Sequence, residues 1–574
     1  MNTLEKIKEN IAEAINKALN KQAVGAADLI YPPKPEFGDL SLPCYQLGKL
    51  FNKSAVEMAE WLVGKVEPEE ISTVKAIGPF INFTFNKTRL APAVIGEIIK
   101  KKSGYGLNKS GRNQRVMIEF SNANTHKEYH VGHLRNLSYG DAVTRILAAN
   151  GYQALPVSYI NDFGIHVAKT LWALKKYFKA EAAGDKSKGY FLGKVYAKAC
   201  QELEKNPAAK EEAAEIMKKI ESRSGAYYKL WRTTRQWSIS GFARIYKELG
   251  VKFDHIFYES EVIDKGMELM AELYKKEFLK KSQGAIIADL ERYGLGVLVF
   301  LRSDGTALYP VADLALAEEK FKRYKINKSV YVVDVRQSLY FKQLFKVLEL
   351  LGFKQEMKHL AYDFVKLPAG MMSSRTGQVV TYDDLRARGF NKAAAETKKR
   401  HKDWSEKKVA AVANKLVNGA LKFEMLKVGA DKPITFDLEQ ALRFDGFTAA
   451  YLQYTAARIN SILRKSQIPI TKSQTNSKFQ IPNFKLENNQ EQAIIMKLVK
   501  YPEIVEAAGR NYAPDELAKY LFELARELND YYHAVPVLKA KADIRQSRLK
   551  LIGAVRQVIA NGLELLGIAV MEEM

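Results

Sequence analysis

The feature that most constrains the fold is an apolar run that ends in a polar turn and leads into a segment with two histidines. The run Val116–Phe120 has the pattern of a buried strand. The turn after it is rich in Ser, Asn and Thr, and His130-Val-Gly-His133 then begins a segment typical of a helix as far as about Leu147. Strand, turn and helix in this order form the repeating unit of an open α/β sheet.

The two histidines of this segment predict a ligand site. His130 and His133 are three residues apart, so both imidazoles lie on one face at the start of the helix. Gly132 between them has no side chain that would keep a ligand away from the backbone. Helix N-termini attract phosphate through unpaired N–H groups and the helix dipole. The segment therefore predicts a polyphosphate-binding turn, although the four residues alone favour a phosphate-free turn with two surface histidines.

The longer stretch around the histidines is more specific than the four residues. It runs Glu119-Phe-Ser-Asn-Ala-Asn-Thr-His-Lys-Glu-Tyr-His-Val-Gly-His-Leu-Arg-Asn136. It resembles the HIGH signature of class I aminoacyl-tRNA synthetases, and its flanking residues resemble the arginyl-tRNA synthetases in particular. The resemblance implies an arginine–tRNA ligase that uses ATP with Mg²⁺, L-arginine and tRNA(Arg). No structural metal bound by the protein is expected.

The resemblance also implies a multidomain α/β architecture. A Rossmann-like class I catalytic core at residues 109–431 is expected to carry an inserted helical region at about 167–250. It would follow an N-terminal α+β domain at 1–108 that binds the tRNA elbow and precede an all-α anticodon-binding domain at 432–574. The polar segment Gln467–Asn489 is predicted as a mobile loop. The candidate strands of the parallel sheet are Val116–Phe120, Ala154–Ile160, Val297–Leu301 and Val330–Val335.

A second motif, Met371-Met-Ser-Ser-Arg375, resembles the KMSKS loop that clamps the ATP phosphates in class I synthetases. Both lysines of that loop are absent here, and methionine supplies no cation for the charge that develops during phosphoryl transfer. Lys127, three residues before His130, is the replacement that the resemblance implies; the alternative is a solvated surface lysine. The predicted catalytic residues are His130, His133, Lys127, Ser373 and Arg375. The predicted ATP-binding residues are His130, Gly132, His133, Met372 and Ser373.

A third group of residues concerns the amino acid. A guanidinium is planar, permanently charged and presents five donors, so its recognition requires carboxylates and amide oxygens held rigidly. Tyr309 and Asp313 are four apart and would share a helix face. They resemble the family's Tyr-x-x-x-Asp element that contacts arginine; a helix cap with core packing is the alternative. The predicted arginine-binding residues, several of them placed by the resemblance alone, are Glu119, Ser121, Asn124, Tyr309, Asp313 and Gln337.

The charge balance and one aromatic segment favour an RNA partner. With 89 Lys and Arg against 65 Asp and Glu, the net charge is +24, which favours a polyanionic partner over a generally lysine-rich composition by a small margin. Phe80 and Asn82 resemble the edge of the family's N-terminal domain that meets the tRNA elbow, where they could stack on a base and bond to its edge. A core phenylalanine is equally compatible with the pattern. Tyr451, Tyr454, Tyr531 and Arg556 would also suit stacking or phosphate contact, with simple packing as the alternative for the tyrosines.

Composition and the chain start indicate the compartment. Cys44 and Cys200 cannot form a disulfide framework or a zinc site, and no apolar stretch approaches the length of a membrane span. The first helix-like segment contains three glutamates, unlike an export signal or a transit peptide. We therefore expect a cytoplasmic protein without a membrane partner, and the resemblance implies a monomer.

Three alternatives to an arginine–tRNA ligase remain open at this point. The first is a class I synthetase for another amino acid, and the second is a non-catalytic RNA-binding paralogue, which the missing loop lysines would suit. The third is a small-molecule adenylyltransferase, which would need neither a helical C-terminal domain nor the high positive charge. One departure from the family pattern has no explanation in the sequence: His166 stands where the family often has glutamine.

Overall fold

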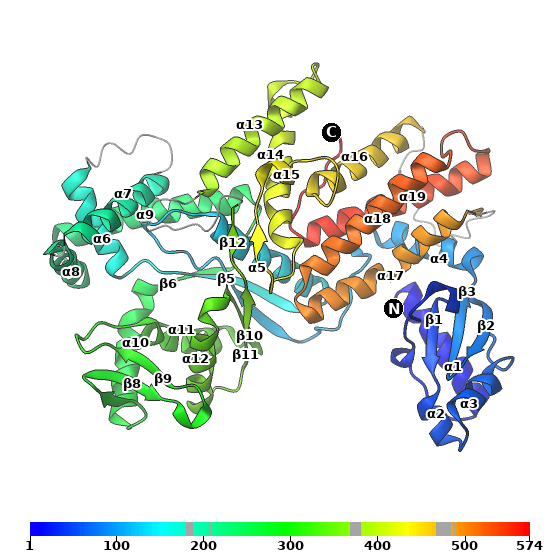
Figure 1. Cartoon of the computed structure of the whole chain (residues 1–574), viewed down its shortest axis with the longest axis horizontal. Helices are drawn as coiled ribbons and strands as arrows, with labels where there is room; N and C mark the ends of the chain where they lie inside the picture. The colour runs from blue at the N-terminus through cyan, green and yellow to red at the C-terminus, as the bar shows by residue number, and fades with distance from the viewer. Residues whose placement is uncertain (179–187, 207, 368–379, 467–483, 487) are drawn as a thin grey trace.

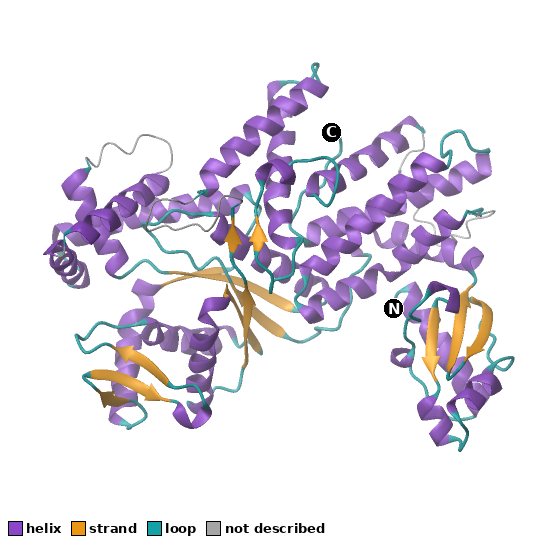
Figure 2. Ribbon diagram, in the orientation of Figure 1, coloured by secondary structure: helices purple, strands orange, loops and turns teal. Residues whose placement is uncertain are grey.

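The computed structural model describes residues 1–178, 188–206, 208–367, 380–466, 484–486 and 488–574. Figures 1 and 2 show a small α/β unit at the N-terminus, a parallel sheet near the centre, a second small sheet beside it, and helices around these. Most C-terminal residues are helical. No helix among the described residues is both long and apolar enough to cross a membrane.

The N-terminal unit is an antiparallel three-stranded sheet with the order β1-β3-β2, covered by helices. Its first helix buries Leu4, Ile7, Ile11 and Ile15, spaced three or four apart as one apolar face requires. Its elements are α1 (Thr3–Leu19), β1 (Leu40–Pro43), α2 (Tyr45–Leu50), α3 (Ala55–Leu62), β2 (Ile71–Ile77) and β3 (Phe80–Phe85).

The central sheet contains five parallel strands in the order β11-β10-β4-β5-β6. Three of the four predicted strands lie in it, so the open parallel sheet is confirmed. From β4 the chain proceeds outward to β5 and β6, whereas β10 and β11 are added on the other side, so the strand order reverses between β4 and β10. Ligands of such sheets bind outside the carboxyl ends at this point. The strands are β4 (Arg115–Glu119), β5 (Gln153–Ile160), β6 (His255–Tyr258), β10 (Lys328–Asp334) and β11 (Glu356–Tyr362).

The fourth predicted strand forms, but its assignment to the parallel sheet is wrong. Val297–Leu301 is β9 of a separate antiparallel sheet with the order β7-β8-β9. The turn Gln283-Gly284 has positive φ at both residues, which suits a tight hairpin between β7 and β8. This sheet accompanies three helices that cover one side of it. The elements are β7 (Lys280–Ser282), β8 (Ala285–Asp289), β9 (Val297–Leu301), α10 (Glu259–Lys275), α11 (Tyr309–Tyr324) and α12 (Ser338–Leu350).

A helical insertion separates β5 from β6, as predicted, and has a hydrophobic core of its own. That core includes Leu171, Trp172, Val195 and Trp231. The four helices are α6 (Ile165–Tyr177), α7 (Lys188–Lys205), α8 (Ala208–Glu221) and α9 (Gly225–Glu248).

Among the described residues of the C-terminal part, the only strand is β13 (Ile434–Thr435), which pairs in parallel with β12 (Val365–Lys366). The expectation of an all-α region from residue 432 therefore needs this correction. The last helix has Lys541 as its N-cap, and Asp543 lies in its first turn. The helices are α13 (Tyr382–Arg400), α14 (Glu406–Leu426), α15 (Leu438–Ala441), α16 (Ala449–Lys465), α17 (Asn489–Asn511), α18 (Pro514–Ala534) and α19 (Ala542–Leu565). An additional helix, α4 (Lys87–Lys101), packs against α17 and α19. Most of the predicted mobile loop, 467–483 and 487, lies outside the described residues.

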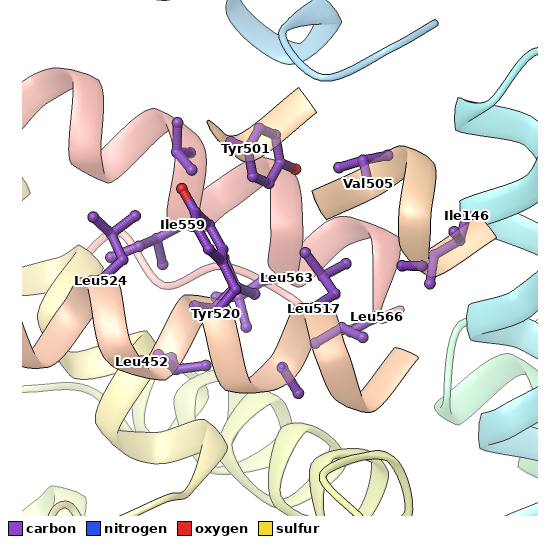
Figure 3. Close-up of a cluster of buried hydrophobic side chains, with 14 of the residues drawn as sticks. Ile146, Leu452, Tyr501, Val505, Leu517, Tyr520, Leu524, Ile559, Leu563 and Leu566 are labelled. Carbon is purple, nitrogen blue, oxygen red and sulfur yellow. The ribbon is translucent and has the colours of Figure 1, made fainter. Parts of the chain in front are cut away.

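Helix α5 (Val131–Ala149) connects the central sheet to these C-terminal helices. Figure 3 shows Ile146 of α5 near Val505 of α17, at the edge of a buried cluster to which α16, α18 and α19 also contribute side chains. Two polar contacts add to this packing: the hydroxyl of Tyr139 donates to the Tyr512 carbonyl at 2.9 Å, and Lys422 Nζ lies 2.8 Å from Asp141 Oδ2. The same ammonium donates to the Gly567 carbonyl at 2.9 Å, so α5, α14 and the segment after α19 meet at one buried cation.

Leu521 on α18 lies at the centre of this packing, and its substitution by alanine is expected to lower the free energy of unfolding by about 2–5 kcal/mol. Its side chain is fully buried and packs closely on Gly562 of α19, where an added Cβ atom would clash with Leu521 Cδ2. The matched control is Lys519→Ala, an exposed site on the same helix, which should change stability by less than about 0.5 kcal/mol. Urea unfolding followed by circular dichroism measures both, and equal losses in the two variants would contradict the predicted packing role.

Candidate active site

A cavity of about 720 Å³ lies at the carboxyl ends of β4, β5 and β10, beside the start of α5. It therefore occupies the point where the strand order of the sheet reverses. Eight of the residues predicted from the sequence line it, although they come from widely separated segments of the chain. They are Glu119, Asn124, His130, Gly132, His133, Tyr309, Asp313 and Gln337.

The two histidines form one end of the cavity. His130 is the N-cap of α5, and its Nδ1 accepts the Gly132 N–H at 3.1 Å. His133 Nδ1 accepts the His130 N–H at 3.2 Å, and the ring centroids are 3.9 Å apart. Because each Nδ1 is an acceptor, each neutral ring carries its proton on Nε2. Burial, with the Lys127 cation, lowers the pKa of His130 to about 4, and burial, with His130 and Lys127, lowers the pKa of His133 well below its ordinary value. Both rings are thus neutral Nε2–H donors at neutral pH.

The segment after the second motif lies against the histidine turn. The Tyr382 N–H donates to the Tyr129 carbonyl at 2.8 Å, and His130 pairs with Thr381 in an antiparallel bridge. The motif itself, with Met371, Met372, Ser373, Ser374 and Arg375, lies outside the described residues, which end at 367 and resume at 380.

Lys127 does not line the large cavity but contributes to a separate small pocket with Tyr129 and Arg244. Its ammonium lies 5.1 Å from the centre of the Tyr196 ring on α7. Since this cation contributes to the lowered pKa values of His130 and His133, it lies within electrostatic reach of both imidazoles.

Carboxyl groups form another part of the cavity wall, and we call this part the carboxyl end and the part with the histidines the imidazole end. Asp313 on α11 accepts a hydrogen bond from the Tyr340 hydroxyl, and burial raises its pKa to about 7. Tyr309, one turn earlier, is 60 % exposed. Glu119 at the end of β4 forms a buried ion pair with Lys320 and accepts from Asn122 Nδ2 at 2.9 Å. The cavity therefore presents carboxylates at one end and imidazole N–H donors at the other.

Three functional candidates at this end were missed by the sequence analysis: Lys320, Tyr340 and Glu259. Lys320 follows Asp313 by seven residues, two helical turns, and this spacing is the signal that could have revealed it. Tyr340 and Glu259 carry no such signal. Burial, together with Asp162 and Asp313, raises the pKa of Glu259 to about 8, although an Asn161 amide donates to it at 3.2 Å.

Four other residues singled out from the sequence lie outside the cavity wall. Ser121 is buried, with its hydroxyl 2.9 Å from that of Tyr129. Phe80 on β3 is partly exposed and packs edge-on against Tyr45, whereas Asn82 on the same strand is only 4 % exposed. His166 lies in the first turn of α6, and its buried Nε2 has no hydrogen-bond partner within the described part of the chain. No three His, Cys, Asp or Glu side chains in that part are arranged to hold a metal ion.

Comparison with protein families gives three matches in chain order. Residues 5–85 match the arginyl-tRNA synthetase N-terminal domain, residues 94–437 the catalytic domain of the class I (R) tRNA synthetases, and residues 452–574 the DALR anticodon-binding domain. The parallel sheet, the histidine turn at its strand-order reversal and these matches together define a class I aminoacyl-tRNA synthetase.

Individual relatives agree along the whole chain. It is 37 % identical to the arginine–tRNA ligase of Bdellovibrio bacteriovorus, covering 95 % of this chain and 94 % of the relative. It is 33 % identical to that of Halothermothrix orenii, covering 99 % of each. The solved Thermus thermophilus arginyl-tRNA synthetase superimposes with a TM-score of 0.80 at 27 % identity, covering 100 % of both chains. The chain belongs to the arginyl-tRNA synthetase family.

Proposed function

We propose that this chain charges tRNA(Arg) with L-arginine in two steps at the one cavity. The carboxylate of arginine attacks the α-phosphate of ATP, which enters as its Mg²⁺ complex, to give arginyl-adenylate and pyrophosphate. A ribose hydroxyl of the terminal adenosine of the tRNA then takes the arginyl group, and AMP leaves. The observation that carries the proposal is the arrangement of the cavity, with buried carboxyl groups at one end and two N–H-donating imidazoles at the start of a helix at the other.

The carboxyl end would bind the amino acid. Asp313 suits the guanidinium because a buried carboxylate forms charge-assisted hydrogen bonds with its planar fork. Glu259 lies outside the cavity wall but within electrostatic reach of Asp313, and would add a second negative charge near the guanidinium. The remaining residues proposed to position arginine are Glu119, Asn124, Tyr309 and Gln337, with Ser121 supporting them through Tyr129.

The imidazole end would bind the phosphates. The Nε2–H groups of His130 and His133 and the backbone N–H groups of α5 are donors suited to the negative charge that develops in the transition state. Such preorganised donors contribute a large share of the rate enhancement in many enzymes. Lys127 would supply the cation that the second motif lacks, with Ser373 and Arg375 of that motif assisting and Met372 contacting ATP. Positioning and charge stabilisation suffice for this chemistry.

The tRNA would contact parts of the chain outside the cavity. Phe80 is proposed to stack on a base of the tRNA elbow, and its partial exposure supports this more strongly than the burial of Asn82 supports a base contact there. The family also suggests that arginine activation requires bound tRNA, and that the chain acts as a monomer in the cytoplasm.

Aminoacylation of tRNA with each of the twenty amino acids tests the proposal. Charging by arginine alone supports it. Charging by another amino acid would identify a synthetase of different specificity, and tight tRNA binding without charging would identify a non-catalytic paralogue. Adenylate formation on a small molecule without RNA binding would favour an adenylyltransferase.

The pH dependence of arginine binding is a further expected result. Asp313 and Glu259, with pKa values raised to about 7 and about 8, are protonated in acid, whereas a guanidinium binds only the ionised carboxylates. The KM for arginine is therefore expected to fall by about tenfold or more between pH 6 and pH 8.5. The KM for ATP is the internal control, because His130 and His133 titrate well below this range. Steady-state aminoacylation from pH 6 to 9 measures both, and a constant arginine KM would contradict the expectation.

A further inference from the structure

Lys320 is a buried cation beneath the carboxyl end of the cavity. Its side chain is 1 % exposed, and that of Glu119, with which it forms an ion pair, is 4 % exposed. The ammonium also lies 4.8 Å from the centre of the Tyr331 ring and 5.7 Å from that of Phe257. A lysine buried this deeply is stable only with a charged partner, and Glu119 is that partner.

The groups that face Lys320 come from every element around it. Glu119 ends β4, Tyr331 lies on β10, Phe257 on β6, and Asp313 lies two turns earlier on the same helix, α11. Burial lowers the pKa of Lys320, but Glu119, Tyr331 and Asp313 outweigh this effect, so its pKa is raised and the ammonium stays charged. In return Lys320 lowers the pKa of Asp313, against the larger effect of burial.

The net charge of the ionisable side chains around the cavity can then be added up. Two further acids near it are already neutralised, since Asp334 is paired with Arg336 and Asp162 with Arg235. The three carboxylates left, Glu119, Asp313 and Glu259, carry −3 when ionised, and Lys320 brings the sum to −2. Arginine offers two cationic groups to these acids, its guanidinium and its α-ammonium, while its own carboxylate is directed at ATP, so the two cationic groups match the sum of −2. Without Lys320 the buried carboxyl groups would carry one uncompensated negative charge, which a low-dielectric site relieves by binding a proton.

We propose that Lys320 is a positioning residue for arginine, which fixes the Glu119 carboxylate in the cavity wall and keeps the pocket carboxyl groups ionised for the two cationic groups of the amino acid. Lys320 does not line the cavity, so it acts through Glu119 and Asp313 and not by touching the substrate. This inference rests on the proposed recognition of arginine by those residues.

The test compares Lys320→Met with Lys320→Arg and the wild type. Arginine-dependent charging by the wild type is established first, so that a failure of the proposed function is recognised before the variants are interpreted. The KM for arginine, the KM for ATP and kcat are then measured from pH 6 to 9. The matched control is Lys322→Met, on the same helix but 72 % exposed and paired with Glu318 at the surface.

In Lys320→Met the midpoint of the arginine KM profile should move upward by about one pH unit or more, because an opposite charge nearby shifts a carboxyl pKa by about 1–3 units. The KM for arginine at pH 7 should rise at least about tenfold, recover towards pH 9, and leave the KM for ATP unchanged. Lys320→Arg should retain the wild-type midpoint because it retains the charge, and Lys322→Met should match the wild type.

An equal rise in arginine KM at every pH, or an unchanged profile, would overturn the proposal and leave Lys320 with a packing role. Lys320→Gln, which is neutral but polar, provides a second variant if the methionine form does not fold. Loss of folding in both neutral variants, with a folded arginine variant, would likewise assign the residue to stability alone.

Discussion

Replacing Asp313 with asparagine is expected to raise the KM for arginine by about 10²–10³-fold. Asparagine keeps the shape of the side chain and can still accept the hydroxyl of Tyr340, but it lacks the charge that a guanidinium requires. Removing one partner of a buried charged pair costs about 3–5 kcal/mol, and the lower part of that cost, about 3–4 kcal/mol, corresponds to this range. Steady-state aminoacylation at saturating ATP and tRNA measures the effect.

The control for Asp313→Asn is Asp264→Asn, a carboxyl group on the exposed side of α10 that pairs with Arg223. It should leave the KM for arginine within about twofold of the wild type. The KM for ATP should not change in either variant, because the imidazole end of the cavity is untouched. An Asp313→Asn enzyme with a normal arginine KM would place guanidinium recognition on Glu259 or outside this pocket.

Lys127→Ala is expected to lower kcat for aminoacylation by about 10²–10³-fold, since the loss of one preorganised donor to transition-state charge has this size. Arginine KM should change little, because Lys127 lies outside the wall of the large cavity. Arginine-dependent pyrophosphate exchange in the presence of tRNA locates the defect in the activation step.

Lys198→Ala is the matched control for Lys127→Ala. Lys198 lies on α7, two residues after Tyr196, and pairs with Glu202 at the surface, so its removal should leave kcat unchanged. If Lys127→Ala still charged tRNA at a normal rate, another residue would have to supply the catalytic cation. Arg375 would then be the next residue to substitute and to test by aminoacylation and pyrophosphate exchange.

The parts of the fold that could be predicted are those specified locally. The apolar run before Ser121, the paired histidines and the inserted helices have patterns whose structure depends on neighbouring residues, and each forms as expected. Val297–Leu301 shows the limit of such patterns. A short apolar run predicts a strand but not its sheet, because the pairing of this strand is decided by a hairpin earlier in the chain.

The residues of the candidate site likewise fall into those that the sequence could predict and those that it could not. Asp313 and Gln337 could be found because they occupy motif positions, and the fold brings them into one cavity wall. Lys320, Tyr340 and Glu259 could not, because a buried partner is defined by what surrounds it and not by its own neighbours in the chain. The burial of Asn82 and the position of Ser121 away from the cavity likewise follow from packing that no motif records.

Helix α5 carries both imidazoles at its N-terminus and also connects them mechanically to the C-terminal helices. Its 19 residues span about 28 Å, with His130 and His133 at one end and the contact of Asp141 with Lys422 and Gly567 near the middle. A continuous helix barely bends over this length. If the C-terminal helices moved by a fraction of an ångström, α5 would therefore move as a rigid body and shift His130 and His133 by nearly the same amount. The alignment of the two N–H donors is therefore set in part by residues that lie near the far end of the chain.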